Sequence, residues 1–174
     1  QGEELGLKEA EIAFEDLTDP YGIRFWPAYK GRDGCRTPMV WEREAPHAGF
    51  SDALRTWLPV SDSHRVLAVD QQDHLSGSML NHYRETLAFR ASQPCLRDGP
   101  MMFLETNGDL LAFIRGEGGE RLLFVFNLDR EPVEWTPPSD LKIAEVVRLH
   151  GFAPVWQDGT VMLTGLDAFC ARLG

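Results

Sequence analysis

The C-terminal part of the chain is a series of short apolar runs separated by turn signals. The runs are Met101–Glu105, Leu110–Arg115, Leu122–Asn127, Val133–Trp135, Ile143–Leu149, Gly159–Thr164 and Leu166–Leu173. They recur every eight to twelve residues or so and are rich in Val, Leu and Phe, which is typical of an antiparallel sandwich of about seven or eight strands. Residues 99–174 are therefore predicted to form an all-β domain.

The first 70 residues have a different character. Proline, glycine and aspartate interrupt them so often that no helical or strand period is sustained. A connection of this length is uncommon inside a compact domain unless it has a function. We expect short helical turns within it, for example at Leu54–Trp57, and a loop that packs on its own aromatic side chains. These are Phe25, Trp26, Tyr29, Trp41 and Trp57.

Between these two parts, residues 70–92 have the clearest helical period. Leu75, Met79, Tyr83 and Leu87 recur at every fourth position and form one apolar stripe. Gly77 weakens the first turn without removing the pattern. The stripe predicts one amphipathic helix that needs a surface to pack on.

Charge and composition exclude several classes of protein. The 17 Lys and Arg residues against 27 Asp and Glu give a net charge of −10, which argues against a nucleic-acid partner because phosphate binding needs a basic face. No apolar run approaches the roughly 18 residues that span a bilayer. The first residues do not have the charged-then-apolar pattern expected of a signal segment. Its odd number of widely spaced cysteines (Cys35, Cys95 and Cys170) predicts reduced thiols and a cytoplasmic location.

Few residues carry a signal for chemistry on their own. The adjacent Glu3 and Glu4 are typical of a solvated turn. The histidines His47, His64, His74, His82 and His150 lack metal-ligand spacing, and several of them are expected in solvated positions. Residues 116–119 (GEGG) lie between two predicted strands, so they predict a hairpin turn rather than a phosphate-binding loop. We therefore expect no catalytic residue, no metal site and no cofactor in this chain.

The segment Gly31–Trp41 (GRDGCRTPMVW) is the exception. Arg32 and Arg36 stand four residues apart around an Asp-Gly turn. The planar, permanently charged guanidinium suits carboxylates and the vicinal hydroxyls of sugars. The alternative is an Arg–Asp lattice that only holds the loop together.

Together with this segment, several others resemble the α-glucosidases of the α-amylase superfamily, and most closely their bacterial oligo-1,6-glucosidase and α-glucosidase branch. The similarity covers essentially the whole chain and is densest over the first 100 residues. The segments are QGEELG at 1–6, FED at 14–16, DPYG at 19–22, RFWP at 24–27, WLPV at 57–60, the helical region with Tyr83 and Arg84, and FVFNL at 124–128.

The resemblance implies an architecture. In that family a (β/α)8 barrel carries the active site at the C-terminal ends of its strands. Residues 1–98 would be the C-terminal end of the barrel, with QGEELG at the end of the eighth strand, followed by the eighth βα loop and the eighth helix. Residues 99–174 would be the β-sandwich domain that follows, so the expected fold is an α+β fragment.

The resemblance also implies a function and a gap. The family cleaves short α-linked gluco-oligosaccharides with retention, using two carboxylates in the manner of retaining glycosidases. Those carboxylates lie upstream of QGEELG, so this chain is expected to be inactive alone. An arginine of the RDxxRTPM loop binds the terminal glucose in these enzymes. Arg36 is our first choice for this role and Arg32 the second.

Other readings of the sequence remain open. The β domain could be a non-catalytic carbohydrate-binding module, with Trp135 or Trp156 as its platform, or a module that only stabilises the barrel. Trp26 and Trp41 are expected in the loop core rather than against sugar. The upstream barrel would be the partner of the 70–92 stripe. Without the barrel, the stripe predicts self-association through the exposed helix face or partial disorder of the N-terminal half.

Overall fold

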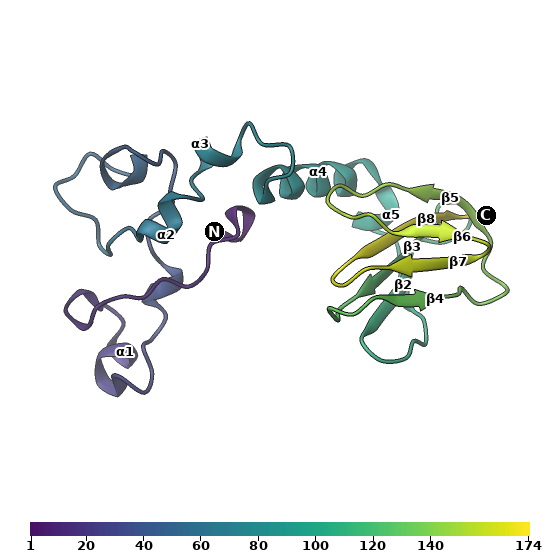
Figure 1. The fold of residues 1–174 in the computed structure, drawn as a ribbon, viewed down its shortest axis with the longest axis horizontal. Helices are drawn as coiled ribbons and strands as arrows, with labels where there is room; N and C mark the ends of the chain where they lie inside the picture. Colours follow the sequence, from purple (N-terminus) through teal and green to yellow (C-terminus); the bar gives the residue numbers. More distant parts are fainter. The chain divides into compact units, whose positions relative to one another are not determined.

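A computed structural model describes residues 1–174 throughout. The chain divides into two compact units, Gln1–Arg84 and Glu85–Gly174, referred to below as the loop unit and the β unit (Figure 1). None of the helices in either unit combines the length and the hydrophobicity needed to span a bilayer.

The loop unit contains no strand and is built from short helical turns. They are η1 (Glu3–Leu5), η2 (Phe14–Asp16), α1 (Pro20–Phe25), η3 (Asp33–Cys35), η4 (Pro46–Gly49), α2 (Asp62–Arg65) and α3 (Val69–Gln72). The start of α1 is set by the residues next to it. The Asp19 carboxylate accepts a hydrogen bond from the Tyr21 N–H at 3.0 Å and Pro20 occupies the first position of α1, as helix N-termini favour. Leu54–Trp57, by contrast, is not helical, so that prediction was wrong.

Aliphatic side chains, not aromatic ones, form the core of the loop unit. One cluster joins Leu5, Met39, Val40, Ala48, Ala68 and Leu80, and a second joins Ala10, Ile12, Leu17 and Leu58. The five loop aromatics expected to form this core are between 36% and 52% exposed. The expectation of an aromatic core was wrong because three of the rings pack in pairs at the surface instead: Trp26 contacts Phe14, Phe25 contacts Tyr21, and Trp57 contacts Phe50.

The single helix predicted for residues 70–92 is two helices. α3 (Val69–Gln72) and α4 (Met79–Ser92) are separated by a turn. The buried Gln72 side chain donates to the Leu5 and Leu67 carbonyls at 2.9 and 2.8 Å and accepts from the Leu80 N–H at 3.0 Å. The Ser78 hydroxyl accepts from the Asn81 N–H at 3.2 Å, so it caps a new helix instead of continuing the old one.

The β unit holds eight strands in two antiparallel sheets (Figure 1). The larger sheet has the order β1-β2-β3-β8-β5 and the smaller sheet the order β4-β7-β6. The strands are β1 (Met101–Phe103), β2 (Leu110–Arg115), β3 (Leu122–Asn127), β4 (Val133–Trp135), β5 (Ile143–Val147), β6 (Val155–Gln157), β7 (Thr160–Leu163) and β8 (Ala168–Leu173). A short helix, α5 (Pro94–Arg97), precedes them.

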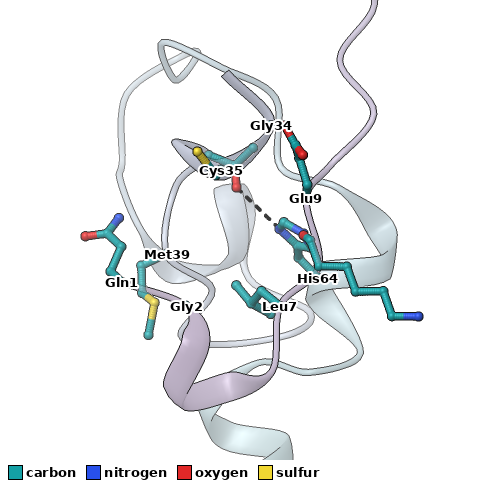
Figure 2. A pocket seen from close by; sticks show the side chains of 10 residues that line it. Gln1, Gly2, Leu7, Glu9, Gly34, Cys35, Met39 and His64 are labelled. Carbon is teal, nitrogen blue, oxygen red and sulfur yellow. Dashed lines mark hydrogen bonds between the residues drawn. The ribbon is translucent and has the colours of Figure 1, made fainter. Parts of the chain in front are cut away.

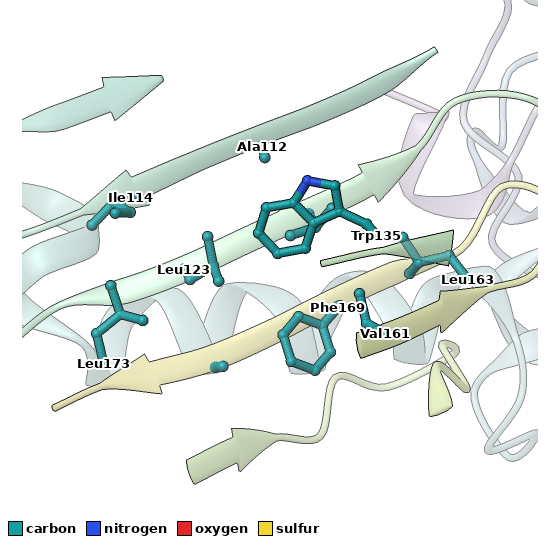
Figure 3. Packing of buried hydrophobic residues seen from close by; sticks show 10 residues of the cluster. Ala112, Ile114, Leu123, Trp135, Val161, Leu163, Phe169 and Leu173 are labelled. Atoms are coloured by element: carbon teal, nitrogen blue, oxygen red, sulfur yellow. The ribbon is translucent and has the colours of Figure 1, made fainter. Parts of the chain in front are cut away.

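The central strands of the larger sheet are buried on both faces. Along β3, Leu123 and Val125 join one hydrophobic cluster while Leu122 and Phe124 join another, because successive strand side chains point to opposite faces. The first cluster combines residues of both sheets, and Figure 3 shows their side chains, with the rings of Trp135 and Phe169 among them. Its members are Ala112, Ile114, Leu123, Val125, Trp135, Val161, Leu163, Phe169, Ala171 and Leu173.

The sequence-based strands agree with this structure except for β6. The run at Val155–Gln157 is short and was not predicted, although the Asp158–Gly159 turn that follows it is a hairpin signal. Residues 116–119 connect the paired strands β2 and β3, as predicted.

The three cysteines are free thiols. Cys35 is exposed, whereas Cys95 and Cys170 are buried. Burial raises the pKa of the Cys170 thiol to about 12, so this side chain behaves as a small apolar core residue.

Candidate functional site

The arginine loop, Gly31–Trp41, is pinned to its surroundings through its backbone. The Gly34 carbonyl accepts from the Ala10 N–H at 3.0 Å, and the Val40 and Trp41 carbonyls accept from residues 69 and 70 at 3.1 and 3.0 Å. A Cβ atom on Gly34 would collide with the Ala10 carbonyl oxygen. Only glycine allows the two backbone segments to approach so closely.

Asp33 is a buried carboxylate that holds the start of α1 in place. It is 1% exposed. Its oxygens accept three hydrogen bonds, from the Thr18 N–H at 2.6 Å, the Thr18 hydroxyl at 2.9 Å and the Asp19 N–H at 2.7 Å. Because no arginine takes part, Asp33 is an anchor for backbone groups and not a member of an Arg–Asp lattice.

Asp19 links this anchor to Arg36. Its carboxylate is buried and accepts from the N–H groups of Arg32 and Tyr21 at 2.9 and 3.0 Å. The Arg36 Nη1 atom lies 3.9 Å from the Asp19 Oδ2 atom, which is close enough for charge attraction but longer than a hydrogen bond. The Arg36 guanidinium therefore has an oriented position and keeps its hydrogen-bond donors for another acceptor.

The structure separates the two candidate arginines. The Arg36 carbonyl accepts from the Trp57 Nε1–H at 2.9 Å, and its side chain is 47% exposed. Arg32 is engaged through its backbone, because its N–H donates to Asp19 and its carbonyl accepts from the Cys35 thiol at 3.1 Å. Both side chains are accessible, but only Arg36 is paired with a carboxylate.

A cavity of about 60 Å³ adjoins the arginine loop, and Figure 2 shows Gly34, Cys35 and His64 around it. His64 is buried, with Nε2 2.7 Å from the Lys8 carbonyl oxygen and Nδ1 3.3 Å from the Thr37 hydroxyl. His64 is therefore not one of the solvated histidines. Its burial depends on contacts with residues 56 and 27 positions away, and no local pattern indicates them.

The other residues considered from the sequence do not form a site for chemistry. Glu3 accepts from the Tyr83 hydroxyl, and Glu4 accepts from the Gly2 N–H at 2.7 Å. Trp26 and Trp41 are exposed rather than part of a core. No group of three or more His, Cys, Asp or Glu side chains is placed to hold a metal ion.

The anchoring carboxylates give the loop unit a pH-dependent stability. Hydrogen bonds from the N–H groups of Arg32 and Tyr21, and the charges of Arg36 and Arg32, lower the pKa of Asp19. Burial raises the pKa of Asp33, but its hydrogen bonds from Asp19 and Thr18 outweigh that effect and the net pKa is lowered. A lowered pKa in the folded state means that the unfolded chain takes up the proton first as the pH falls.

We therefore expect the loop unit to have its full carboxylate stabilisation above about pH 4 and to lose it progressively below that pH. Urea midpoints measured from pH 7 down to pH 2.5 check this prediction. The Asp33→Asn variant should lose less stability over the same range, since one of the two groups no longer titrates. Equal losses in the two proteins would contradict the assignment.

Comparison with known proteins gives this geometry a context. The alpha-amylase catalytic-domain family matches residues 1–99, and the chain belongs to that family. It is 50% identical over 173 residues to a probable alpha-glucosidase of Rhizobium meliloti (strain 1021), a match that covers 99% of this chain and 31% of that protein. A glucan 1,6-alpha-glucosidase of Streptococcus dysgalactiae subsp. equisimilis is 32% identical over 193 residues, covering 99% of this chain and 35% of that protein.

A solved structure is similar over the whole chain. The alpha-glucosyl transfer enzyme XgtA is 44% identical, with a TM-score of 0.89, and the match covers 100% of this chain and 32% of that one. The chain thus spans about a third of the length of the relatives it matches. The resemblance inferred from QGEELG and GRDGCRTPMVW is confirmed at the level of the family.

Proposed function

We propose that this chain is the C-terminal portion of a retaining α-glucosidase that acts on short α-linked gluco-oligosaccharides. Residues 1–98 are assigned to the end of a (β/α)8 barrel, including its eighth βα loop and eighth helix, and residues 99–174 to a β-sandwich domain. The names of the relatives and the length of the match support this proposal. So does the cluster that combines residues of both sheets.

Arg36 is the residue of this chain that we assign to the substrate. Its accessible guanidinium beside the buried Asp19 carboxylate is the observation that carries the proposal. A planar fork of donors can hold vicinal hydroxyls of a terminal glucose and so align the bond to be cleaved. Arg32, engaged through its backbone, is the second choice.

The catalytic nucleophile and the general acid/base belong, in this proposal, to the part of the protein that precedes residue 1. Retaining cleavage needs two carboxylates about 5 Å apart on either side of the scissile bond. Glu3 and Glu4 are engaged with Tyr83 and Gly2 and are not assigned to this role. The chain alone is therefore proposed to be inactive, and the longer protein is proposed to act in the cytoplasm.

The test compares residues 1–174 with the same chain extended by its upstream sequence, using an aryl α-glucoside as substrate. We expect hydrolysis by the extended protein and none by the chain alone. In the extended protein, Arg36→Ala should lower kcat/KM by about 30-fold, or about 2 kcal/mol, the value of a hydrogen bond to a charged group. Arg32→Ala should have a smaller effect. Hydrolysis by the chain alone, or a larger loss for Arg32→Ala, would contradict these assignments.

The chain without its upstream partner is also proposed to self-associate. Leu75, Met79 and Leu87 are 59%, 47% and 54% exposed, and apolar groups that lack a partner favour association. Sedimentation velocity should show a dimer fraction that rises with concentration and falls in a Leu87→Glu variant. A monomer at every concentration would contradict the proposal.

A further inference from the structure

The β unit has a groove that the function proposed above does not use. It lies where β5 leads into the segment 148–154 and on to β6, and its lining includes Val147, Arg148, Phe152, Pro154 and Trp156. Its volume of about 660 Å³ is typical of small-molecule sites, which range from about 300 to 1,000 Å³. Arg148 is the only charged residue in the lining, and there is no carboxylate.

Trp156 lines this groove, and its indole ring is held in place by packing on Phe169. Its ring stacks on Phe169 with a centroid distance of 5.6 Å and an interplanar angle of 24°, and Phe169 is fully buried. Trp156 also pairs with Val161 in the β6–β7 hairpin. Because Phe169 covers one face of the indole, the surface that Trp156 contributes to the groove comes from its other face and its edges.

The structure distinguishes the two tryptophans that the sequence left open as sugar platforms. Trp135 is 8% exposed and belongs to the core between the sheets (Figure 3). It has no surface to offer a ligand. Trp156 is partly exposed and lines the groove.

Arg148 provides the polar contact. Its side chain is exposed and belongs to none of the ion pairs in the chain. The guanidinium has five N–H donors in a plane and no acceptor. It can therefore donate to neighbouring hydroxyl groups without breaking an existing contact.

We propose that this groove is a second carbohydrate site, which binds an α-linked gluco-oligosaccharide away from the arginine loop. A glucose ring presents C–H groups on its faces and hydroxyls around its edge, so it matches a flat aromatic surface next to a hydrogen-bond donor. The C–H face packs on Trp156 and the hydroxyls accept from Arg148. The ligand is uncharged, which fits a lining that offers no carboxylate. The choice of α-linked glucose rests on the proposed function.

The test is an NMR titration of the ¹⁵N-labelled chain, residues 1–174, with maltotriose and isomaltotriose. The protein has five tryptophans, whose indole N–H signals are assigned by single substitutions. We expect the Trp156 signal to shift saturably and the Trp135 signal to stay in place. Cellotriose, the β-linked control, should give a shift that needs at least tenfold more sugar.

Four variants make the assignment specific. Followed through the backbone N–H signals that shift in the parent, Trp156→Leu should weaken binding at least tenfold, whereas Trp156→Phe keeps a flat ring and should stay within about threefold of the parent. Val155→Ala is the matched control, because this neighbour on the same strand is 56% exposed and outside the lining. Arg148→Gln should weaken binding severalfold and, being exposed, does not depend on the packing on Phe169.

Three results would overturn the proposal. The first is that the Trp156 signal shows no saturable shift. The second is that Trp156→Leu and Arg148→Gln both bind the sugar as tightly as the parent. The third is that cellotriose binds as tightly as the α-linked sugars. The aryl α-glucoside assay tests the proposed function, and the NMR titration tests the groove, so the two proposals can fail independently. Hydrolysis by the extended protein without a Trp156 shift rejects the groove alone, and a Trp156 shift without hydrolysis rejects the α-glucosidase assignment alone.

Discussion

Replacing Asp33 with alanine is expected to destabilise the loop unit by about 3 kcal/mol. The substitution removes the acceptor of three hydrogen bonds and leaves the buried Asp19 N–H and the partly buried Thr18 N–H without this partner. Each unsatisfied buried donor costs about 1–3 kcal/mol, and such costs add only in part. Urea denaturation, with hydrogen exchange over residues 10–40, measures the loss and its location.

Two variants define what the Asp33 result means. Asp16→Ala removes an exposed carboxylate three residues before Asp19 and should change stability by less than about 0.5 kcal/mol. Asp33→Asn keeps one carbonyl acceptor and should fall between that variant and Asp33→Ala. A loss below about 1 kcal/mol for Asp33→Ala would show that water replaces the carboxylate and that Asp33 is not an anchor.

The same change has a consequence for the arginine loop. Asp33 fixes the backbone of Asp19, whose carboxylate accepts from the Arg32 N–H and faces the Arg36 guanidinium. Exchange protection of the Arg32 N–H should therefore fall in Asp33→Ala. This effect follows from the linked contacts even though Asp33 touches neither arginine side chain.

Phe169→Ala is expected to cost the β unit about 3–5 kcal/mol, the range for a buried aromatic residue whose cavity does not collapse. Phe169 is fully buried in the cluster shared by the two sheets and supports Trp156 by stacking. Urea denaturation followed by near-ultraviolet circular dichroism measures the loss. The tryptophan signal should also weaken, because Trp156 loses its neighbour.

Leu128→Ala is the matched control for Phe169. Leu128 is 58% exposed, so its truncation should stay within about 0.5 kcal/mol of the parent. If Phe169→Ala cost no more than Leu128→Ala, the shared cluster would not be the core that holds the β unit together.

The strands of the β unit could be predicted because their signal is local. Runs such as Leu122–Asn127 are continuous and apolar, which is what a strand covered on both faces requires. β6 was missed because Val155–Gln157 (VWQ) does not alternate apolar and polar residues, whereas the equally short Val133–Trp135 (VEW) does. The helix over residues 70–92 was predicted as one because its apolar spacing continues through the break. The interruption depends on the Gln72 side chain, which donates to the distant Leu5 carbonyl and accepts from the Leu80 N–H, contacts that an apolar spacing does not encode.

The sequence by itself determined the family of this protein, the positions of most of its strands and the pair of arginines that could meet a ligand. These features reside in consecutive residues, so a short window of the chain contains them. Only the tertiary structure decided which arginine faces a buried carboxylate, that Asp33 anchors backbone rather than arginine, and that Trp156 rather than Trp135 lines a groove. Each of these depends on contacts between residues well separated along the chain. Burial and hydrogen bonding at such contacts are set by folding, and local residue preferences do not encode them.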